Sequence, residues 1–140
     1  MRPQYYLEAV AETDPGCVRG NNEDSFAVDL EIGLFIVADG MGGHNSGEVA
    51  ARNANAEIQS LARGLLAGGR NLPVEGGDST QTARERQLAY CVAGANTIIF
   101  EKGRLMPKDS GMGTTVVAVL ADCKTLTVAH VGDSRLYLFR

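Results

Sequence analysis

The chain has 140 residues, of which 44% are hydrophobic and 21% charged, a composition that excludes disordered, collagen-like and coiled-coil proteins and predicts one globular domain. Thirteen basic and seventeen acidic residues give a formal net charge of -4, so we expect no general attraction to nucleic acid or to a membrane surface. The sequence shows no signal peptide and no apolar run near the ~20 residues of a membrane span, which predicts a cytoplasmic protein.

The N-terminal part of the chain predicts three strands. Residues 5–11 and 25–29 are short runs rich in apolar side chains, separated by turn-forming and polar residues. Residues 34–38 form a continuous apolar run, which predicts a strand buried on both faces. This strand ends abruptly at Asp39 and Gly40.

Two amphipathic helices are expected next. The first begins near Asn45, which can cap the helix together with Glu48, and the second begins with the capping pair Thr82 and Glu85. Residues 67–80 are rich in Gly and Pro and predict an exposed loop. The expected buried stripes comprise Ala50, Ala54, Ile58, Leu61 and Leu65 on the first helix, and Leu88, Val92, Ala95 and Ile99 on the second.

Beyond Lys108 the pattern alternates and is rich in β-branched residues. The runs TTVVAVLA, TLTVAHV and RLYLF predict three consecutive strands, with a tight turn at residues 122–124. Strands, then helices, then a meander indicate an α+β fold in which helices pack on antiparallel sheet. Because Arg140 directly follows a strand-like run, we expect a domain that is truncated at its C-terminus.

Two segments carry candidate metal ligands. In LFIVADGMGGH an apolar strand delivers Asp39 into a glycine turn, which suits a metal ligand but also an ordinary Asp-Gly turn. In RGNNED the adjacent acids Glu23 and Asp24 repel each other unless a cation compensates them, so a divalent-ion site and a solvated loop are both open. All-oxygen ligands would select Mg²⁺ or Mn²⁺.

Four motifs in order, RGNNED, ADGMGGHNSGEVAA, GMGTT and HVGDSRLY, resemble those of the metal-dependent type 2C (PPM family) protein serine/threonine phosphatases in their bacterial form. The resemblance covers residues 14–137. It implies a layered sandwich of antiparallel β-sheets flanked by helices. It also implies hydrolysis of phosphoserine and phosphothreonine in proteins through a metal-activated water, with two or three Mn²⁺ or Mg²⁺ ions in the complete enzyme. Such an enzyme would act in signalling on a phosphorylated protein, either a serine/threonine kinase or its target.

The resemblance also implies roles for individual residues. Arg19 matches the arginine that holds the substrate phosphate, and Asp39 matches the carboxylate that bridges two metal ions, with the Gly40 carbonyl as a further ligand. Glu23 and Asp24 match acids that hold metal-bound waters. Asp109 matches the acid of a third, weaker metal position, whereas Asp133 is expected to organise a turn.

The chain departs from the family pattern in two ways. Met41 stands where many eukaryotic members have a candidate proton-donating histidine, and neither His44, expected at the surface, nor His130, expected in the core, is predicted to replace it. The later aspartates that complete both metal positions have no counterpart in this chain. We therefore expect the chain to be a poor phosphatase and to self-associate through a free strand edge.

Two other functions compete with this interpretation. A pseudophosphatase or regulatory fragment would bind a phosphorylated partner without turnover, and it stays open because of the absent acids. A nucleotide-binding glycine loop is disfavoured, because Gly40, Gly42, Gly43 and Gly47 do not make GxGxxG and no P-loop lysine follows. Cys17, Cys91 and Cys123 lack CxxC spacing and predict reduced, mostly buried thiols.

Overall fold

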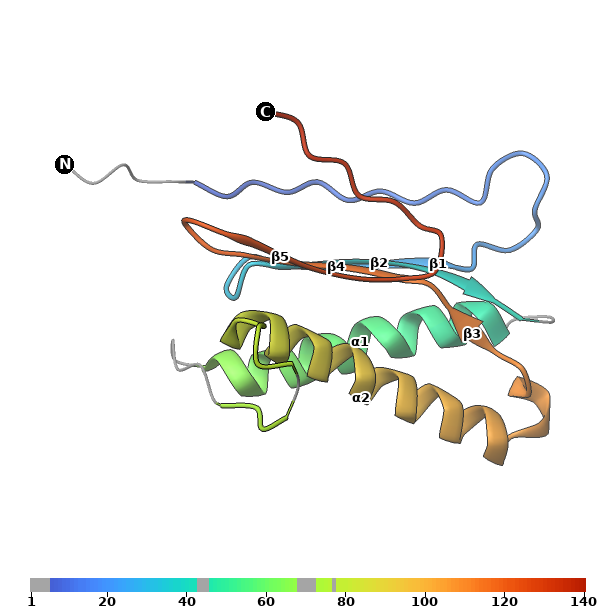
Figure 1. Cartoon of the computed structure of the whole chain (residues 1–140). Coiled ribbons are helices and arrows are strands. Elements are labelled where there is room, and N and C mark those ends of the chain that lie inside the picture. Colours follow the sequence, from blue (N-terminus) through green and yellow to red (C-terminus); the bar gives the residue numbers. More distant parts are fainter. Residues whose placement is uncertain (1–5, 43–45, 68–72, 77) are drawn as a thin grey trace.

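The chain folds into one antiparallel sheet covered on one face by two long helices (Figure 1). The computed structural model describes residues 6–42, 46–67, 73–76 and 78–140. The elements are β1 (Asp24–Asp29), β2 (Leu34–Met41), α1 (Ser46–Leu66), α2 (Ala83–Leu105), the short 3-10 helix η2 (Pro107–Asp109), β3 (Gly113–Thr114), β4 (Val116–Ala121) and β5 (Leu126–Val131). The strand order is β1-β2-β4-β5, and β3 pairs with the end of β2. The predicted α+β class is confirmed, and within the described residues its layers are one sheet and one pair of helices.

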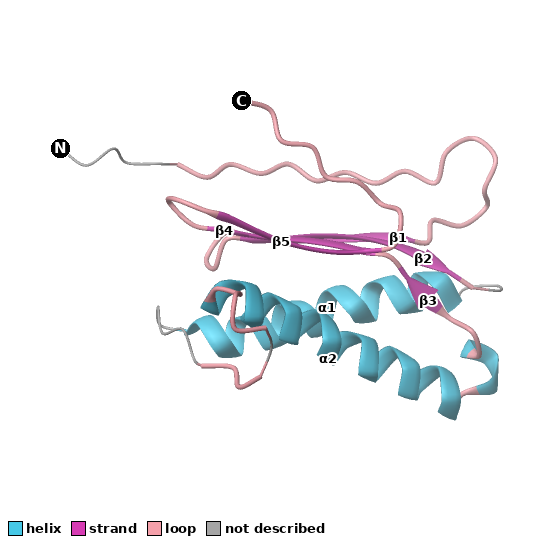
Figure 2. Cartoon of the chain, viewed as in Figure 1, coloured by secondary structure: helices cyan, strands magenta, loops and turns pink. Residues whose placement is uncertain are grey.

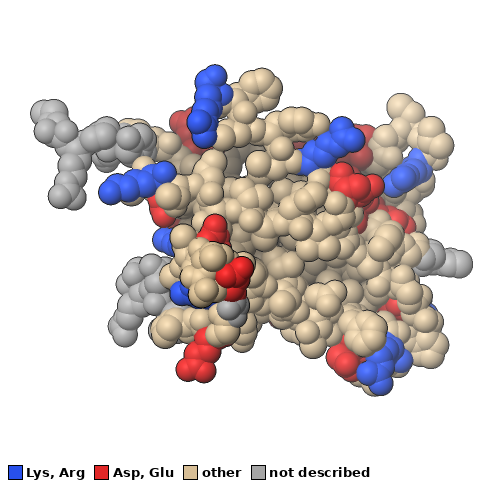
Figure 3. Space-filling view, in the orientation of Figure 1, with Lys and Arg blue, Asp and Glu red and all other residues tan. Residues whose placement is uncertain are grey.

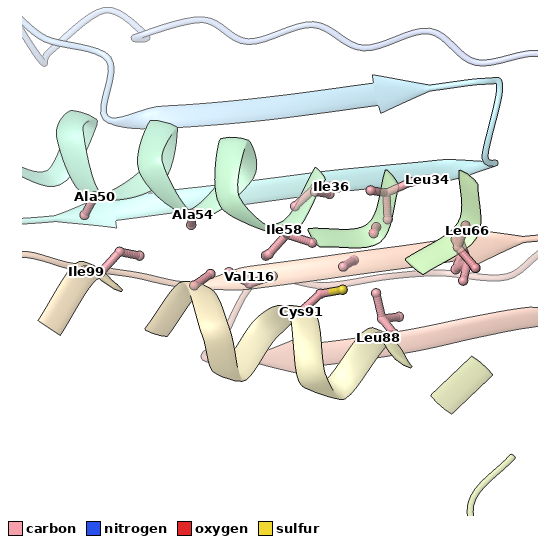
Figure 4. Packing of buried hydrophobic residues seen from close by; sticks show 14 residues of the cluster. Leu34, Ile36, Ala50, Ala54, Ile58, Leu66, Leu88, Cys91, Ile99 and Val116 are labelled. Carbon is pink, nitrogen blue, oxygen red and sulfur yellow. The ribbon is translucent and has the colours of Figure 1, made fainter. Parts of the chain in front are cut away.

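The hydrophobic core lies between the sheet and the two helices (Figure 4). Alternate residues of β2 and β4 face the helices, because successive strand side chains point to opposite faces. Ile58 of α1 and Leu88 of α2, which are 0% and 2% exposed, fill the space between the layers. The predicted helix stripes are confirmed: Ala50, Ala54, Ile58, Leu88, Ala95 and Ile99 are buried, while Leu61, Leu65 and Val92 are partly buried against them.

The face of the sheet that points away from the helices, here called the outer face, is largely apolar and keeps several side chains exposed. It carries the exposed side chains Phe26, Val28, Val37, Leu126 and Val128. The prediction that residues 34–38 are buried on both faces is therefore wrong, because exposure alternates along β2. Uniformly apolar composition could not show that only one face of this strand meets the helices.

Both terminal segments cross the outer face without joining the sheet (Figures 1 and 2). The strand predicted at residues 5–11 is absent at residues 6–11, which are irregular and exposed, and Tyr5 lies outside the described residues. The strand predicted from RLYLF is likewise irregular. β-propensity describes a side chain's fit to a pleated surface and does not supply the neighbouring strand that a ladder needs.

Side-chain contacts fix α1 on β1 along its length. Asn55 Nδ2 donates to Ser25 Oγ at 2.9 Å, and near the helix end Arg63 Nε lies 2.6 Å from Asp29 Oδ2. Burial alone would raise the pKa of Asp29, but hydrogen bonds from Gln59 and Arg63 outweigh it and lower that pKa. The contacts set the position of α1, whose first turn meets the open end of the β1–β2 hairpin.

The two helix starts test the capping predictions. Thr82 and Glu85 form the expected capping box, with Thr82 N–H donating to Glu85 Oε2 at 2.6 Å and Glu85 N–H donating to Thr82 Oγ1 at 3.2 Å. Asn45 lies outside the described residues, and Glu48 of the first turn of α1 pairs with Arg52 at 2.8 Å. The tight turn at residues 122–124 is confirmed, with Asp122 Oδ1 accepting from the Lys124 and Thr125 N–H groups.

Two predictions about buried residues are wrong. Of the three free cysteines only Cys91 is buried, and its surroundings raise its thiol pKa to about 11, whereas Cys17 and Cys123 are exposed in turns. His130 is exposed rather than in the core, and its Nε2 lies 2.7 Å from the Ser134 carbonyl oxygen. Among the described helices, none is long and apolar enough to cross a membrane.

Candidate metal and phosphate site

The candidate site lies at the open end of the β1–β2 hairpin. The antiparallel register places Asp24, the first residue of β1, directly opposite Asp39 of β2, and both point to the outer face. The N–H of Gly40 donates to the carbonyl oxygen of Glu23 at 3.1 Å and closes this end of the hairpin. Three predicted ligands, Glu23, Asp24 and Asp39, are therefore neighbours because of strand pairing.

Glu23 packs against the start of α1 because Gly40 and Gly47 have no side chains. A Cβ at Gly40 would stand 2.0 Å from the Gly47 carbonyl oxygen, and a Cβ at Gly47 would stand 2.7 Å from Glu23 Oε2. Real Cβ atoms do not approach other atoms this closely, so neither position accepts a side chain without movement of the backbone. The glycines thus bring the strand end, the acidic loop and the first turn of α1 into direct contact.

Two threonines of the GMGTT motif hold the backbone of Asp39. Asp39 N–H donates to Thr115 Oγ1 at 3.0 Å, Thr115 N–H donates to the Asp39 carbonyl oxygen at 2.8 Å, and Thr114 Oγ1 donates to the same oxygen at 3.0 Å. Thr115 Oγ1 also lies 2.7 Å from Ser134 Oγ. The sequence alone predicts no role for these threonines, and its one signal for them is a pair of hydroxyl side chains directly after the run Gly-Met-Gly.

A pocket of about 610 Å³, here called the acidic pocket, brings the predicted residues together. Its wall includes the predicted phosphate ligand Arg19, the acids Glu23 and Asp39, and Gly40. Asp133, expected only to organise a turn, lines the same pocket. Asp24 faces a neighbouring cavity that shares Asp39 with the acidic pocket.

Asp109 is not among the residues that line the acidic pocket. It lies in η2 and is 8% exposed, and its backbone carbonyl packs close to Gly103 of α2. Ser46 Oγ donates to the carbonyl of the preceding residue, Lys108, at 3.0 Å, which links η2 to the start of α1. His44 lies outside the described residues.

The donor chemistry of this site fits a hard divalent ion, although the described residues do not form a finished coordination shell. Carboxylates and a backbone carbonyl are the ligands that Mg²⁺ and Mn²⁺ prefer. Within the described ranges, however, no group of three or more His, Cys, Asp or Glu side chains is placed to hold one ion. Glu23, Asp24 and Asp39 would therefore supply only part of the ligands that such an ion needs.

The electrostatics at the open end of the β1–β2 hairpin also favour binding of a cation. Desolvation by the surrounding chain, and then the charge and hydrogen bond of Asp39, raise the pKa of Asp24, while the nearby Arg19 guanidinium lowers it. Like charges directly opposite on paired strands destabilise a sheet. Without a cation, the folded protein thus carries a cost at neutral pH that a bound cation would remove.

We predict that Asp24→Asn stabilises the metal-free protein at pH 7, by no more than about 1 kcal/mol because the carboxyl group stays accessible to solvent. A raised folded-state pKa penalises folding only where the carboxyl is ionised, so the gain should vanish as the pH falls below about 4. Urea unfolding at pH 7 and pH 3 measures both values. Asp78→Asn, at an exposed carboxyl whose pKa hydrogen bonds from Thr80 lower, should change stability in the opposite direction at pH 7.

A sequence model of the protein phosphatase 2C family matches residues 19–140. The chain belongs to this family. The serine/threonine protein phosphatase PstP of Mycobacterium tuberculosis (strain H37Rv) is 37% identical over 134 residues, which cover 96% of this chain and 23% of that protein. The serine/threonine phosphatase stp of Listeria innocua is 32% identical over 139 residues, 96% of this chain and 50% of its own length.

Solved structures of protein phosphatase 2C relatives share the fold. The crystal structure of M. tuberculosis PstP/Ppp superposes with a TM-score of 0.68 at 34% identity, covering 87% of this chain and 45% of that one. The PstP catalytic domain in complex with two manganese ions gives a TM-score of 0.66 at 36% identity, covering 87% and 46%. Staphylococcus aureus Stp1 gives 0.69 at 30% identity, covering 87% and 45%. The chain spans half or less of the length of these relatives.

Proposed function

We propose that this chain carries the phosphate clamp and part of the metal site of a protein serine/threonine phosphatase. The observation that carries the proposal is the register that sets Asp24 opposite Asp39, beside a pocket lined by Arg19. The two bacterial relatives are named as serine/threonine phosphatases, and a PstP catalytic domain binds two manganese ions, which supports the same chemistry here.

The proposed metal ligands are Asp39, the Gly40 carbonyl, Glu23 and Asp24, with Asp109 serving a third ion. Two or three Mn²⁺ or Mg²⁺ ions, when bound, supply Lewis acidity toward water and toward the phosphoryl group. The chain's own residues provide the framework: Thr114 and Thr115 hold the Asp39 backbone, and Gly47 leaves room for the Glu23 carboxylate.

Arg19 is proposed to bind the substrate phosphate. It lines the acidic pocket and lies near enough to Asp24 for its charge to offset part of the rise in the pKa of that carboxyl. A guanidinium donates two parallel hydrogen bonds to phosphate oxygens. Because it is itself positively charged, it cannot act as a ligand of a metal cation. The substrate would be a phosphoserine or phosphothreonine of a signalling protein, such as a serine/threonine kinase or its target.

Arg19→Ala should weaken binding of a phosphate ester about tenfold, since hydrogen bonds between charged groups are stronger than neutral ones and this site is open to solvent. Mn²⁺ affinity should change little. Arg19→Lys keeps the positive charge but loses the paired N–H donors of the guanidinium, so it should restore only part of the phosphate affinity. Titration calorimetry with Mn²⁺ and competition with inorganic phosphate give the two affinities. A large loss of Mn²⁺ affinity with unchanged phosphate affinity would contradict the assignment.

A second candidate function is binding of a phosphorylated partner without turnover. It is favoured because the described residues include no group of three side chains placed to hold an ion. Mn²⁺-dependent hydrolysis of p-nitrophenyl phosphate by the purified chain separates the two functions: we expect slow turnover from a phosphatase site and none from a binding module.

We further propose that the chain self-associates through its outer face. Phe26, Val37 and Leu126 are 40%, 52% and 52% exposed there, and β5 is the last strand in the sheet order. Exposed apolar faces and unpaired strand edges favour association. Light scattering on the purified chain measures its mass, and a monomer at all concentrations would rule this proposal out.

A further inference from the structure

An apolar groove opens between α2 and the β3–β5 side of the sheet. It has a volume of about 580 Å³, and no Asp, Glu, Lys or Arg lines it. Exposed Ala93 and Phe100 of α2 form one wall, and Val131 of β5, which is 50% exposed, belongs to the other. The face of the molecule seen in Figure 3 has an uncharged centre, with acidic side chains to the left of it and further charged side chains toward the margins.

The groove adjoins the acidic pocket across the pairing of β2 with β3. Met41 lines both cavities, and it pairs with Gly113 in the ladder. Its side chain lies across the Gly113 backbone, since a Cβ on Gly113 would stand 2.9 Å from Met41 Cε. The next two residues divide between the cavities, with Thr114 in the groove and Thr115 in the acidic pocket.

We propose that the groove receives an apolar side chain of the phosphoprotein substrate that flanks the phosphorylated residue, with Met41 as the specificity-determining residue between the two sites. This inference rests on the proposed function. An apolar occupant fits best because, apart from Asn96, Thr114 and His130, the lining is apolar, and a charged side chain would lose its hydration there without an Asp, Glu, Lys or Arg as partner.

The edge of the sheet supports an extended ligand. In the part of the chain that the structure describes, β4 is the one strand paired with β5, so the other side of β5 offers backbone groups for which a peptide and a second copy of the chain would compete. Ala129 and Val131 of β5 also line the groove, and a peptide paired there would direct alternate side chains into it.

The test uses two fluorescein-labelled peptides that contain a phosphonate analogue of phosphothreonine, which is not hydrolysed. The peptides differ only in carrying leucine or serine on both sides of the phosphonate. With Mn²⁺ present, the leucine peptide should bind the 140-residue chain about tenfold more tightly in fluorescence anisotropy, the effect of burying one or two apolar side chains. Ala93→Glu should abolish this preference. Thr97→Glu, at an exposed position of the same helix outside the groove, should preserve it.

Each other outcome overturns the inference in a distinct way. Equal affinity for both phosphonate peptides would leave the proposed function standing and remove the groove from substrate recognition. If neither peptide bound better than its counterpart with plain threonine, the proposed function would fail and this inference with it. Phosphonate-independent binding of the leucine peptide would make the groove a separate docking site. A dimer in light scattering that Ala93→Glu dissociates would show that a second copy occupies it.

Discussion

Asp39→Asn should lower the Mn²⁺ affinity of the chain at least about 100-fold, because even groups that merely support a metal ligand cost about 10- to 100-fold when they are replaced. Asp39 lines both the acidic pocket, which contains Glu23, and the cavity beside Asp24. Its replacement therefore removes a carboxylate next to both of these acids. Any Mn²⁺-dependent hydrolysis should fall with the affinity, since the metal supplies the Lewis acidity. Titration calorimetry with Mn²⁺, followed by a p-nitrophenyl phosphate assay, measures both effects.

The loss should not come from unfolding. Removing the Asp39 charge relieves its repulsion with Asp24 across the β1–β2 pair, so the variant should be at least as stable as the parent without metal. Asp78→Asn makes the same charge change in the loop before α2 and should leave Mn²⁺ affinity unchanged. Near-normal Mn²⁺ binding by Asp39→Asn would show that the ion is held elsewhere.

Gly40→Ala should destabilise the fold by at least about 3 kcal/mol, a value in the upper range for overpacking. The added Cβ would stand 2.0 Å from the Gly47 carbonyl oxygen and 2.7 Å from the Glu23 carbonyl oxygen. Both are backbone atoms, which cannot turn away as a flexible side chain can. The end of β2 must therefore separate from α1 or from the acidic loop, and urea unfolding measures the cost.

Gly64→Ala is the matched control. Gly64 lies in α1, and nothing is within 4 Å of a Cβ built there. Because glycine costs roughly 0.5–1 kcal/mol relative to alanine inside a helix, this variant should be more stable than the parent by about that amount. Equal effects of the two substitutions would mean that the contact between Gly40 and Gly47 does not constrain the fold.

Local patterns predicted the parts of the fold that local physics determines. The spacing of apolar residues placed both helices, and the reciprocal hydrogen bonds of Thr82 and Glu85 marked the start of α2 within a few residues. The strands later seen as β1, β2, β4 and β5 were also predicted. Their signals lie within short windows of sequence, where periodicity and capping act.

Contacts between distant segments could not be predicted in this way. The hydrogen bond between Thr115 and Asp39 joins residues that are 76 positions apart in the sequence. The close contact between Gly40 and Gly47 depends on how α1 packs against the end of β2. The predictions of strands in both terminal segments were wrong for the same reason, because a strand forms only where a neighbouring strand is available for pairing. Asp133 was placed in a turn, and only the folded chain shows that this turn borders the acidic pocket.

The β1–β2 hairpin also has a consequence for the order of assembly. Its strands are joined by residues 30–33 alone, so Asp24 and Asp39 meet after closure of a very short loop. Such closure costs little entropy, and hairpins form within about 1–10 μs, before contacts that span most of the chain. We therefore expect the register that sets Asp24 opposite Asp39 to be selected early in folding, before α2 and β4 pack against the hairpin.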